Sequence, residues 1–198
     1  EFWTMKADYN VCLYVRKVTR MALRATELNL ITTYLHMTDP SQFRPAFART
    51  TPGRTLMLSQ MKAIDVGFYR FLYNSVGEQW CWRDRRLMSD RELRTILANP
   101  CTSVHVLYVN GVPAGYAELS ARGRETEIAY FGLRPQYIGQ GLGKHLLSCA
   151  IARAWDDGAE RIWLHTCNLD SPHALSNYLK RGFQIYDVRE EPMPERYA

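Results

Sequence analysis

A run of alternating glycines near residue 140 is the part of this sequence best suited to bind an anion. Gly139, Gly141 and Gly143 occupy every second position where an apolar-periodic segment begins, so few side chains shield the backbone N–H groups. The first amides of a helix lack intrahelical partners and lie at the positive end of the helix dipole, which attracts phosphate groups. Lys144 and Arg134 add positive charge. The stretch is therefore predicted to be a phosphate site at the start of a helix.

Two common phosphate motifs do not fit these glycines. A Walker loop needs a glycine separated by four residues from the Gly-Lys pair and a Ser or Thr after that pair, whereas Ile138 and His145 occupy those positions. A dinucleotide fingerprint lies in the first βα turn of its fold, whereas these glycines lie well past the middle of the chain. Neither a P-loop nor a Rossmann site is predicted.

The glycine stretch and two flanking segments together resemble the GNAT superfamily of N-acetyltransferases. Residues 139–144 are similar to the loop that binds the acyl-CoA pyrophosphate in that family. Residues 127–135 resemble its fourth strand, and residues 174–183 resemble the end of its Ala-x-x-Leu-Tyr-x-x-x-Gly-Phe helix. The resemblance covers roughly residue 55 onward. Three ordered motifs make it specific.

The register of the loop motif leaves one position unusual. When Gly141 and Gly143 are placed on the two motif glycines, Ile138 stands where the family has Arg or Gln. A shifted register with Gln136 and Gly139 also matches the motif as it is usually written, but the spacing to the flanking motifs favours the first. Backbone donors are therefore expected to provide most of the phosphate contacts.

The resemblance implies direct transfer of an acetyl group from acetyl-CoA to a primary amine, with no metal. Such a site needs a base for the amine, an amide N–H for the developing oxyanion, and an acid for the leaving thiolate. The resemblance assigns the amide to Phe131, and it pairs the backbone of Leu133 with pantetheine where the adjoining strand splays away. The cofactor-binding residues implied are Phe131, Gly132, Leu133, Ile138, Gly139, Gln140, Gly141, Leu142, Gly143 and Lys144.

Four side chains are candidates for proton transfer. Glu127 matches the strand-borne base of the family, and Glu118 is its rival, because antiparallel pairing could bring the two carboxylates together and raise the pKa of one. Tyr178 matches the tyrosine that protonates the thiolate. His165 is a further candidate at the acceptor. The alternatives are a solvated strand residue for each glutamate, a core aromatic for Tyr178 and a structural imidazole for His165.

The acceptor pocket is expected near a tryptophan-rich segment. Trp80 and Trp82, with Arg83 and Asp84, are predicted to form its wall, because indole faces attract ammonium groups; the alternative is a loop pinned to the core by its aromatics. Small amines, an amino acid, an antibiotic, a lysine side chain and a protein N-terminus all stay open as acceptors. An alternative function, favoured by Ile138, is a non-catalytic acyl-CoA sensor.

Hydrophobic periodicity indicates which elements would position these residues. Apolar runs, the Asn110-Gly111 hairpin signal and the Ser89 capping box indicate an α/β (α+β) fold with an antiparallel meander. The resemblance implies a GNAT-like mixed, mostly antiparallel central sheet flanked by helices in a single domain. The predicted strands are 30–37, 54–61, 103–109, 112–120, 127–133, 162–167 and 183–188. The predicted helices are 64–76, 89–99, 142–157 and 171–182, with an irregular segment over 77–88.

Composition narrows the class of protein further. With 198 residues, 46% hydrophobic and 23% charged, the chain suits one globular domain with an N-terminal extension. The resemblance implies a GNAT domain over 30–190, which leaves the extension over 1–29 and a polar tail over 191–198. The net charge of +5 is dispersed, so no nucleic-acid partner is predicted. The scattered cysteines indicate neither disulfides nor zinc. No membrane span or signal peptide is recognised, which favours the cytoplasm. A monomer and a homodimer both stay open.

Overall fold

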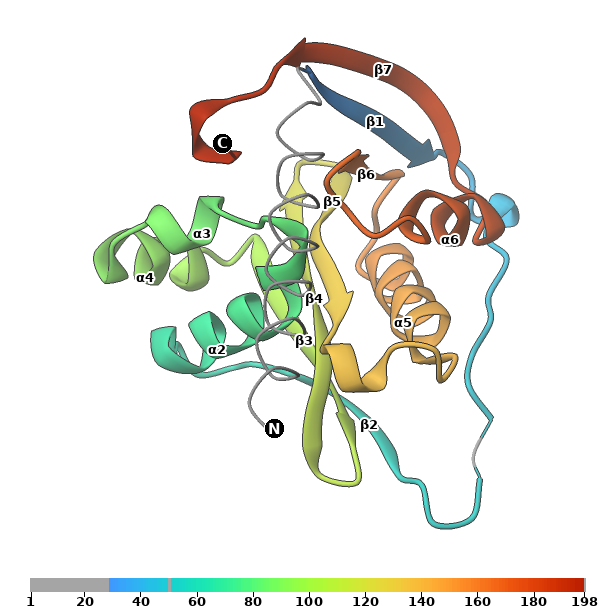
Figure 1. Ribbon diagram of the computed structural model, residues 1–198. Coiled ribbons are helices and arrows are strands. Elements are labelled where there is room, and N and C mark those ends of the chain that lie inside the picture. The colour runs from blue at the N-terminus through green and yellow to red at the C-terminus, as the bar shows by residue number, and fades with distance from the viewer. Residues whose placement is uncertain (1–28, 50, 198) are drawn as a thin grey trace, which may run out of the picture.

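The computed structural model describes residues 29–49 and 51–197, which build a seven-stranded sheet with helices on both faces (Figure 1). The strand order is β2-β3-β4-β5-β6-β1-β7, and each neighbouring pair is antiparallel except β5 with β6. This confirms the predicted mixed, mostly antiparallel sheet. The strands are β1 (Asn29–Met37), β2 (Leu56–Gln60), β3 (Thr102–Val109), β4 (Val112–Arg122), β5 (Glu125–Leu133), β6 (Arg161–Cys167) and β7 (Gln184–Pro192).

The three central strands β3, β4 and β5 form the predicted meander. Asn110 and Gly111 both have positive φ, at 49° and 79°, which is the backbone that a tight turn between twisted strands requires. Gly123, with a φ of 63°, makes the next turn. The predicted extension over residues 1–29 lies outside the described residues except for Asn29, which begins β1.

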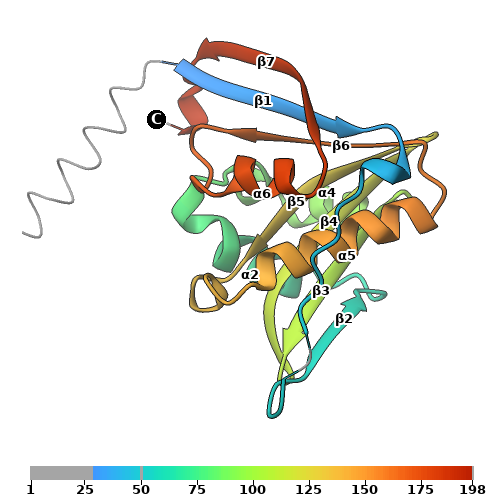
Figure 2. The same cartoon turned by 90° about the vertical axis from the view of Figure 1, so that its right-hand side faces the viewer.

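The helices divide between the two faces of the sheet. Figures 1 and 2 show α2, α3 and α4 on one face and α5 and α6 on the other. The predicted capping box of α4 is present, since Ser89 Oγ accepts from the Glu92 amide and Glu92 Oε2 accepts from the Ser89 amide. The helices are α2 (Val66–Gly77), α3 (Asp84–Leu87), α4 (Asp90–Ala98), α5 (Leu142–Asp156) and α6 (Ala174–Lys180). The 3-10 helices are η1 (Pro40–Gln42), η2 (Glu78–Trp80), η3 (Pro135–Tyr137) and η4 (Glu195–Tyr197).

Each face of the sheet has its own hydrophobic core. The apolar stripe of α5 is fully buried as predicted, and it packs with Ile128, Ile162 and Leu164 of β5 and β6. On the other face, α2 packs against β3 and β4 through Tyr69 and Tyr116, among others. The sheet between these cores is therefore fixed on both sides over its central strands.

The predicted start of the last helix was wrong. Ser171 was expected as its N-cap and Pro172 as its first helical residue, but the helix begins at Ala174. Ser171 instead starts a separate turn in which its carbonyl accepts from the Ala174 amide at 2.9 Å and its Oγ accepts from the His173 amide at 3.3 Å. The segment 77–88, expected to be irregular, contains η2 and α3. Cys81 between them has a φ of 58°, which reverses the chain.

The parallel pair β5 and β6 separates partway along its length. The two strands pair only over Glu125–Glu127 with Arg161–Trp163, and the register of the described residues then ends. Beyond Glu127 one edge of β5 faces a space instead of a strand, which agrees with the splayed edge that the sequence analysis expected. This opening decides where a ligand can enter the sheet.

No helix in the described part of the chain is both long and apolar enough to cross a membrane.

Candidate functional site

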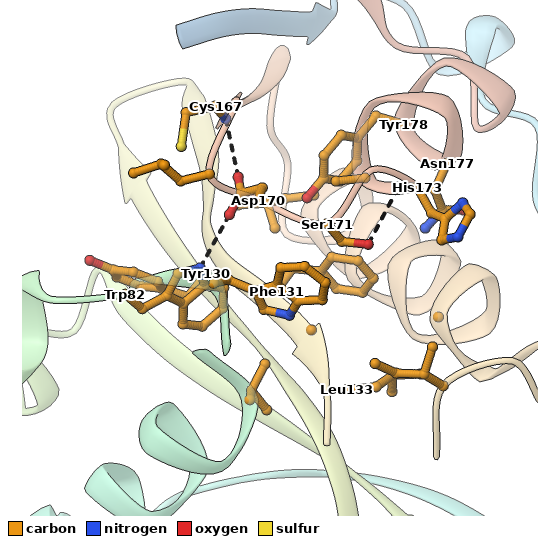
Figure 3. A pocket seen from close by; sticks show the side chains of 18 of the residues that line it. Trp82, Tyr130, Phe131, Leu133, Cys167, Asp170, Ser171, His173, Asn177 and Tyr178 are labelled. Atoms are coloured by element: carbon orange, nitrogen blue, oxygen red, sulfur yellow. Dashed lines mark hydrogen bonds between the residues drawn. The ribbon is translucent and has the colours of Figure 1, made fainter. Parts of the chain in front are cut away.

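A cavity of about 730 Å³ fills the opening between β5 and β6 (Figure 3). Its walls come from β5, from the end of β6 and the turn after it, from α6, from the glycine stretch before α5, and from the segment between α2 and α3. Elements that are far apart in the sequence therefore meet around one space. Apolar and aromatic side chains make up much of this lining, in keeping with a small-molecule site.

The glycine stretch before α5 contributes to the wall of this cavity. Gly139 and Gly141 have φ values of 83° and 74°, and Gly141 is the N-cap of α5 without a side-chain capping bond. The first amides of α5 are therefore left for a ligand. Gly143 and Lys144 line the cavity with these glycines, as does Ile138.

Two residues of the predicted loop do not line the cavity. Leu142 is fully buried in the core against the sheet. Gln140 turns back and donates from Nε2 to the Gln136 carbonyl at 2.9 Å. Lys180 and Arg181 at the end of α6 do line the cavity. Sequence reasoning missed them, although the Lys-Arg-Gly at the end of the predicted helix was the available signal.

The free edge of β5 carries a β-bulge beside the cavity. Glu118 pairs with Tyr130 and Leu119 with Ile128, so Ala129 is an extra residue in β5. Phe131, Gly132 and Leu133 follow it and line the cavity. The bulge changes which side chains face each side of the sheet, and it places Tyr130 on the face of α2.

Tyr178 lines the cavity from α6, and Figure 3 shows its side chain directed inward. Its ring packs edge-on against Phe131 at 6.2 Å and against Phe183 at 6.2 Å. Burial raises the pKa of the Tyr178 phenol well above its usual value, and the neighbouring Asp170 and Cys167 raise it further. The hydroxyl therefore stays protonated at neutral pH, as a proton donor must.

Glu127 lies at the point where β5 and β6 separate. Its carboxylate Oε1 is 3.7 Å from His165 Nδ1, and His165 lines the cavity while Glu127 stands behind it. Burial raises the pKa of Glu127, an effect that the charges of His165 and Arg122 partly oppose. A carboxylate with a raised pKa next to a cavity is suited to accept a proton near neutral pH.

Glu118 is engaged elsewhere. It is buried away from the cavity, where Oε1 pairs with Arg85 Nη2 at 2.6 Å and Oε2 accepts from the Tyr69 hydroxyl at 2.5 Å. The bulge also places it opposite Tyr130, so it is not the cross-strand partner of Glu127. Its proximity still contributes a minor part of the raised pKa of Glu127.

Trp82 forms the part of the cavity wall that lies against the end of α2. Its ring packs against Tyr73 and Tyr130, each at 5.3 Å between centroids. It also lies against Gly77, where a Cβ would be 2.4 Å from the indole, so the slot for the ring requires glycine there. Trp80 lines the same region. Both tryptophans thus line the cavity, and Trp82 is also pinned by tilted ring contacts, as the alternative in the sequence analysis described.

Asp170 is a cavity residue that sequence reasoning missed. Its Oδ2 accepts from the Thr166 hydroxyl at 2.7 Å and the Cys167 amide at 3.1 Å, and its Oδ1 accepts from Trp82 Nε1 at 3.3 Å (Figure 3). It therefore joins the end of β6 to the tryptophan wall. An Asp just after a predicted strand and before Ser-Pro was the only available signal, and it indicates a turn more readily than a site.

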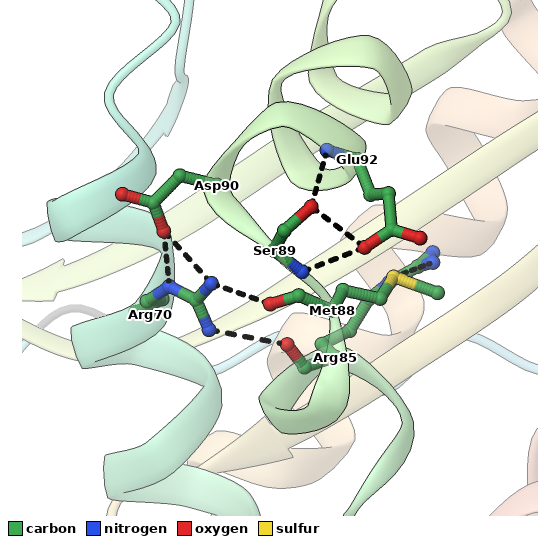
Figure 4. A network of polar contacts seen from close by, with 6 residues as sticks. All are labelled: Arg70, Arg85, Met88, Ser89, Asp90 and Glu92. Carbon is green, nitrogen blue, oxygen red and sulfur yellow. Dashed lines mark hydrogen bonds and ion pairs between the residues drawn. The ribbon is translucent and has the colours of Figure 1, made fainter.

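The segment that carries Trp82 and Asp84 is fixed to α2 by a polar network (Figure 4). Arg70 on α2 donates to the Met88 carbonyl at 2.7 Å, to the Arg85 carbonyl at 3.3 Å and to Asp90 at 2.8 Å. These bonds cap the carbonyls at the end of α3. The network keeps α3 against α2 and so fixes the chain next to the Trp82 wall of the cavity.

The C-terminal segment also reaches the cavity. Tyr197 of η4 lines it, and Arg196 Nε is 3.2 Å from Asp84 Oδ1. β7 itself continues to Pro192, two residues beyond the domain boundary that the sequence suggested. Within residues 29–49 and 51–197, no group of three or more His, Cys, Asp or Glu side chains could hold a metal ion.

Comparisons with known proteins agree with this geometry. A family model described as the acetyltransferase (GNAT) family matches residues 69–183. An uncharacterized N-acetyltransferase of Mycobacterium tuberculosis is 33% identical over 104 residues, which cover 52% of this chain and 65% of that protein. This chain therefore matches just under two thirds of the length of that relative.

Two solved structures share the fold. A GCN5-related N-acetyltransferase from Sphaerobacter thermophilus has a TM-score of 0.56 at 15% identity, covering 87% of this chain and 56% of its own. The aminoglycoside N-acetyltransferase AAC(6')-Iy, solved in complex with CoA, has a TM-score of 0.51 at 17% identity, covering 68% of this chain and 92% of its own.

Proposed function

Because the chain belongs to the GNAT family of acetyltransferases, as its motifs predicted, and is therefore an acyltransferase, we propose that it transfers the acetyl group of acetyl-CoA to a primary amine by direct attack. One observation carries the proposal. A single cavity joins the free amides at the start of α5, the unpaired edge of β5 and the Glu127–His165 pair. Those are the parts needed to hold a diphosphate, align a thioester and deprotonate an amine.

The residues at one end of the cavity fit acetyl-CoA. The amides that begin α5 would hold the diphosphate, and Lys144, Lys180 and Arg181 line the same end with positive charge. Ile138 offers no side-chain donor, so the main chain and these cations would provide the binding. The complex of AAC(6')-Iy with CoA supports the choice of ligand. The same neighbour, an aminoglycoside acetyltransferase, favours a small molecule as acceptor.

Glu127 is the proposed base and works through His165. The imidazole lines the cavity and would accept the proton of the acceptor ammonium at Nε2, while its Nδ1 proton passes to Glu127. The present separation of 3.7 Å is longer than a hydrogen bond and would shorten when the acceptor binds. Glu118, already paired with Arg85, keeps a structural role in this proposal.

Tyr178 is the proposed acid, and the Phe131 amide is the proposed oxyanion donor. The two residues are adjacent, since their rings are in contact at 6.2 Å. A covalent route through Cys167 is disfavoured, because burial raises the pKa of this thiol to about 11 and leaves little thiolate at neutral pH. Direct attack by the amine is therefore the route that these groups support.

The function is tested by the release of free thiol from acetyl-CoA in the presence of a panel of primary amines. We expect release that depends on both the amine and the enzyme, and we expect acetyl-CoA to bind in calorimetry without an amine. Binding with no thiol release across the panel would instead support the acyl-CoA sensor. Absence of binding would contradict both functions.

The role of Tyr178 gives a smaller, specific prediction. Replacing Tyr178 with Phe should lower kcat about tenfold, because the thiolate loses its proton donor but remains a fair leaving group near neutral pH. The dissociation constant of acetyl-CoA should change little, since the ring and its contacts with Phe131 and Phe183 remain. Tyr186→Phe is the matched control, because Tyr186 is exposed on β7 outside the cavity. Equal kcat for the two variants would remove Tyr178 from the mechanism.

A further inference from the structure

The cavity lining carries charges of both signs. It includes Lys144 in the first turn of α5, and Lys180 and Arg181 at the end of α6. Asp84 and Asp170 are the carboxylates in the lining among the described residues, and both lie by the Trp82 wall. The cationic side chains suit the phosphates of acetyl-CoA. The two carboxylates are not needed for that ligand, so their charge concerns the acceptor.

Asp170 has no cationic partner among the described residues. Each hydrogen bond it accepts comes from a neutral donor, namely the Trp82 indole, the Thr166 hydroxyl and the Cys167 amide. A carboxylate fixed in this way at a cavity wall attracts a cation from the cavity. The three donors also hold it in place, so it does not have to be ordered when a ligand arrives.

Asp84 already binds a cationic group of this chain. Its Oδ1 pairs with the Arg196 guanidinium at 3.2 Å, and the same guanidinium lies over the Tyr197 ring at 4.7 Å. A cation of this chain thus occupies a place between a carboxylate and an aromatic ring at the cavity mouth. Both partners of the pair are nearly half exposed, so the contact is weak and an incoming cation can replace it.

The aromatic wall completes the environment. Trp82, Tyr73 and Tyr130 are in mutual contact at 5.2 to 5.3 Å between centroids. Indole and phenol faces attract ammonium and guanidinium groups, most strongly where water is excluded. Carboxylates alone would attract any cation, but carboxylates beside this wall favour an organic one.

We propose that the acceptor carries a second cationic group, an ammonium or guanidinium that does not react, held between Asp84, Asp170 and the Trp82 wall. This inference rests on the proposed function and names its substrate class as a dicationic amine. Arg196 leaves Asp84 when that group binds. The reacting amine then lies toward His165, which lines the same cavity.

The test compares acceptors that share one reacting amine and one chain length. Putrescine and agmatine carry a second cation, the corresponding amino alcohol carries a neutral group, and the corresponding amino acid carries an anion. Measured by thiol release, kcat/KM should be about tenfold higher for the two dications than for the amino alcohol, and lowest for the amino acid. Equal values for putrescine and the amino alcohol would overturn the inference while leaving the acetyl transfer intact.

Charge-neutral variants assign the preference to these residues. Asp84→Asn and Asp170→Asn should each reduce the ratio of putrescine to amino alcohol, chiefly through KM, because the amide oxygen of asparagine at 170 can still accept from Thr166 and the Cys167 amide and so hold the turn. Asp157→Asn is the matched control, since Asp157 pairs with Arg153 outside the cavity. Arg196→Gln should lower KM for putrescine only. An unchanged ratio in both cavity variants would overturn the assignment. Loss of thiol release with every acceptor, with acetyl-CoA still bound, would instead contradict the proposed function.

Discussion

Replacing Glu127 with Gln is expected to lower kcat about 100-fold, since general bases typically contribute 10² to 10⁴ in rate. The variant keeps the shape of the side chain but cannot take the proton that His165 passes on. Acetyl-CoA binding should be unchanged, because the diphosphate end of the cavity lies at the start of α5, away from Glu127. Steady-state kinetics and calorimetry measure the two effects separately.

The pH dependence of the native enzyme gives the same prediction a second readout. Burial raises the pKa of Glu127, so its carboxylate becomes protonated at a higher pH than an exposed one would. Only the ionised form accepts a proton, so kcat should fall as the pH decreases through that raised pKa. In the Glu127→Gln variant this fall of kcat at low pH should disappear. The remaining rate should then depend on the fraction of the acceptor amine that is unprotonated.

Glu125→Gln is the matched control for this prediction. Glu125 lies two residues earlier on β5 and pairs with Arg161 at 3.0 Å, but it is about half exposed and does not line the cavity. Its replacement should leave kcat and the pH profile unchanged. A kcat for Glu127→Gln within twofold of that control would show that another group takes the proton.

Replacing Gly182 with Ala should destabilise the fold by roughly 3 kcal/mol, the sum of positive-φ strain and overpacking. Gly182 has a φ of 104°, which L side chains rarely adopt, and a Cβ there would lie 1.9 Å from the Gln42 carbonyl oxygen. The Gln42 carbonyl belongs to the backbone at the end of η1, so the chain there would have to move. The Arg44 amide, which donates to the Arg181 carbonyl at 2.9 Å, would move with it.

Thermal and denaturant unfolding measure this loss against Gly158→Ala. Gly158 also has a positive φ, of 87°, but nothing lies within 4 Å of a Cβ built there. Its replacement should cost only the backbone strain, about 1 kcal/mol. Equal unfolding free energies for the two variants would show that the backbone at Gln42 moves at little cost and that overpacking there does not destabilise the fold.

The glycines, caps and hairpin could be read from the sequence because each depends on local conformation. Asn110-Gly111, the Ser89 capping box and the α5 stripe were placed correctly for that reason. The partners of Glu118 and of Trp82 could not be read, because Arg85 and Asp170 reach them through tertiary contacts. The β-bulge at Ala129 likewise places Glu118 opposite Tyr130 instead of near Glu127, and no spacing in the sequence predicts this bulge.

The place of β1 in the sheet has a consequence for synthesis of the chain. β1 precedes both of its neighbours, β6 and β7, and the Ile31 amide bonds with Asn168, 137 positions later. The peptide groups of β1 therefore have no strand partners until β6 and β7 have been synthesised, and closing so long a loop has an entropic cost. The part of the cavity wall formed by β6 is completed only then. A ribosome-bound chain in which the glycine loop has already been synthesised should therefore not yet bind the coenzyme.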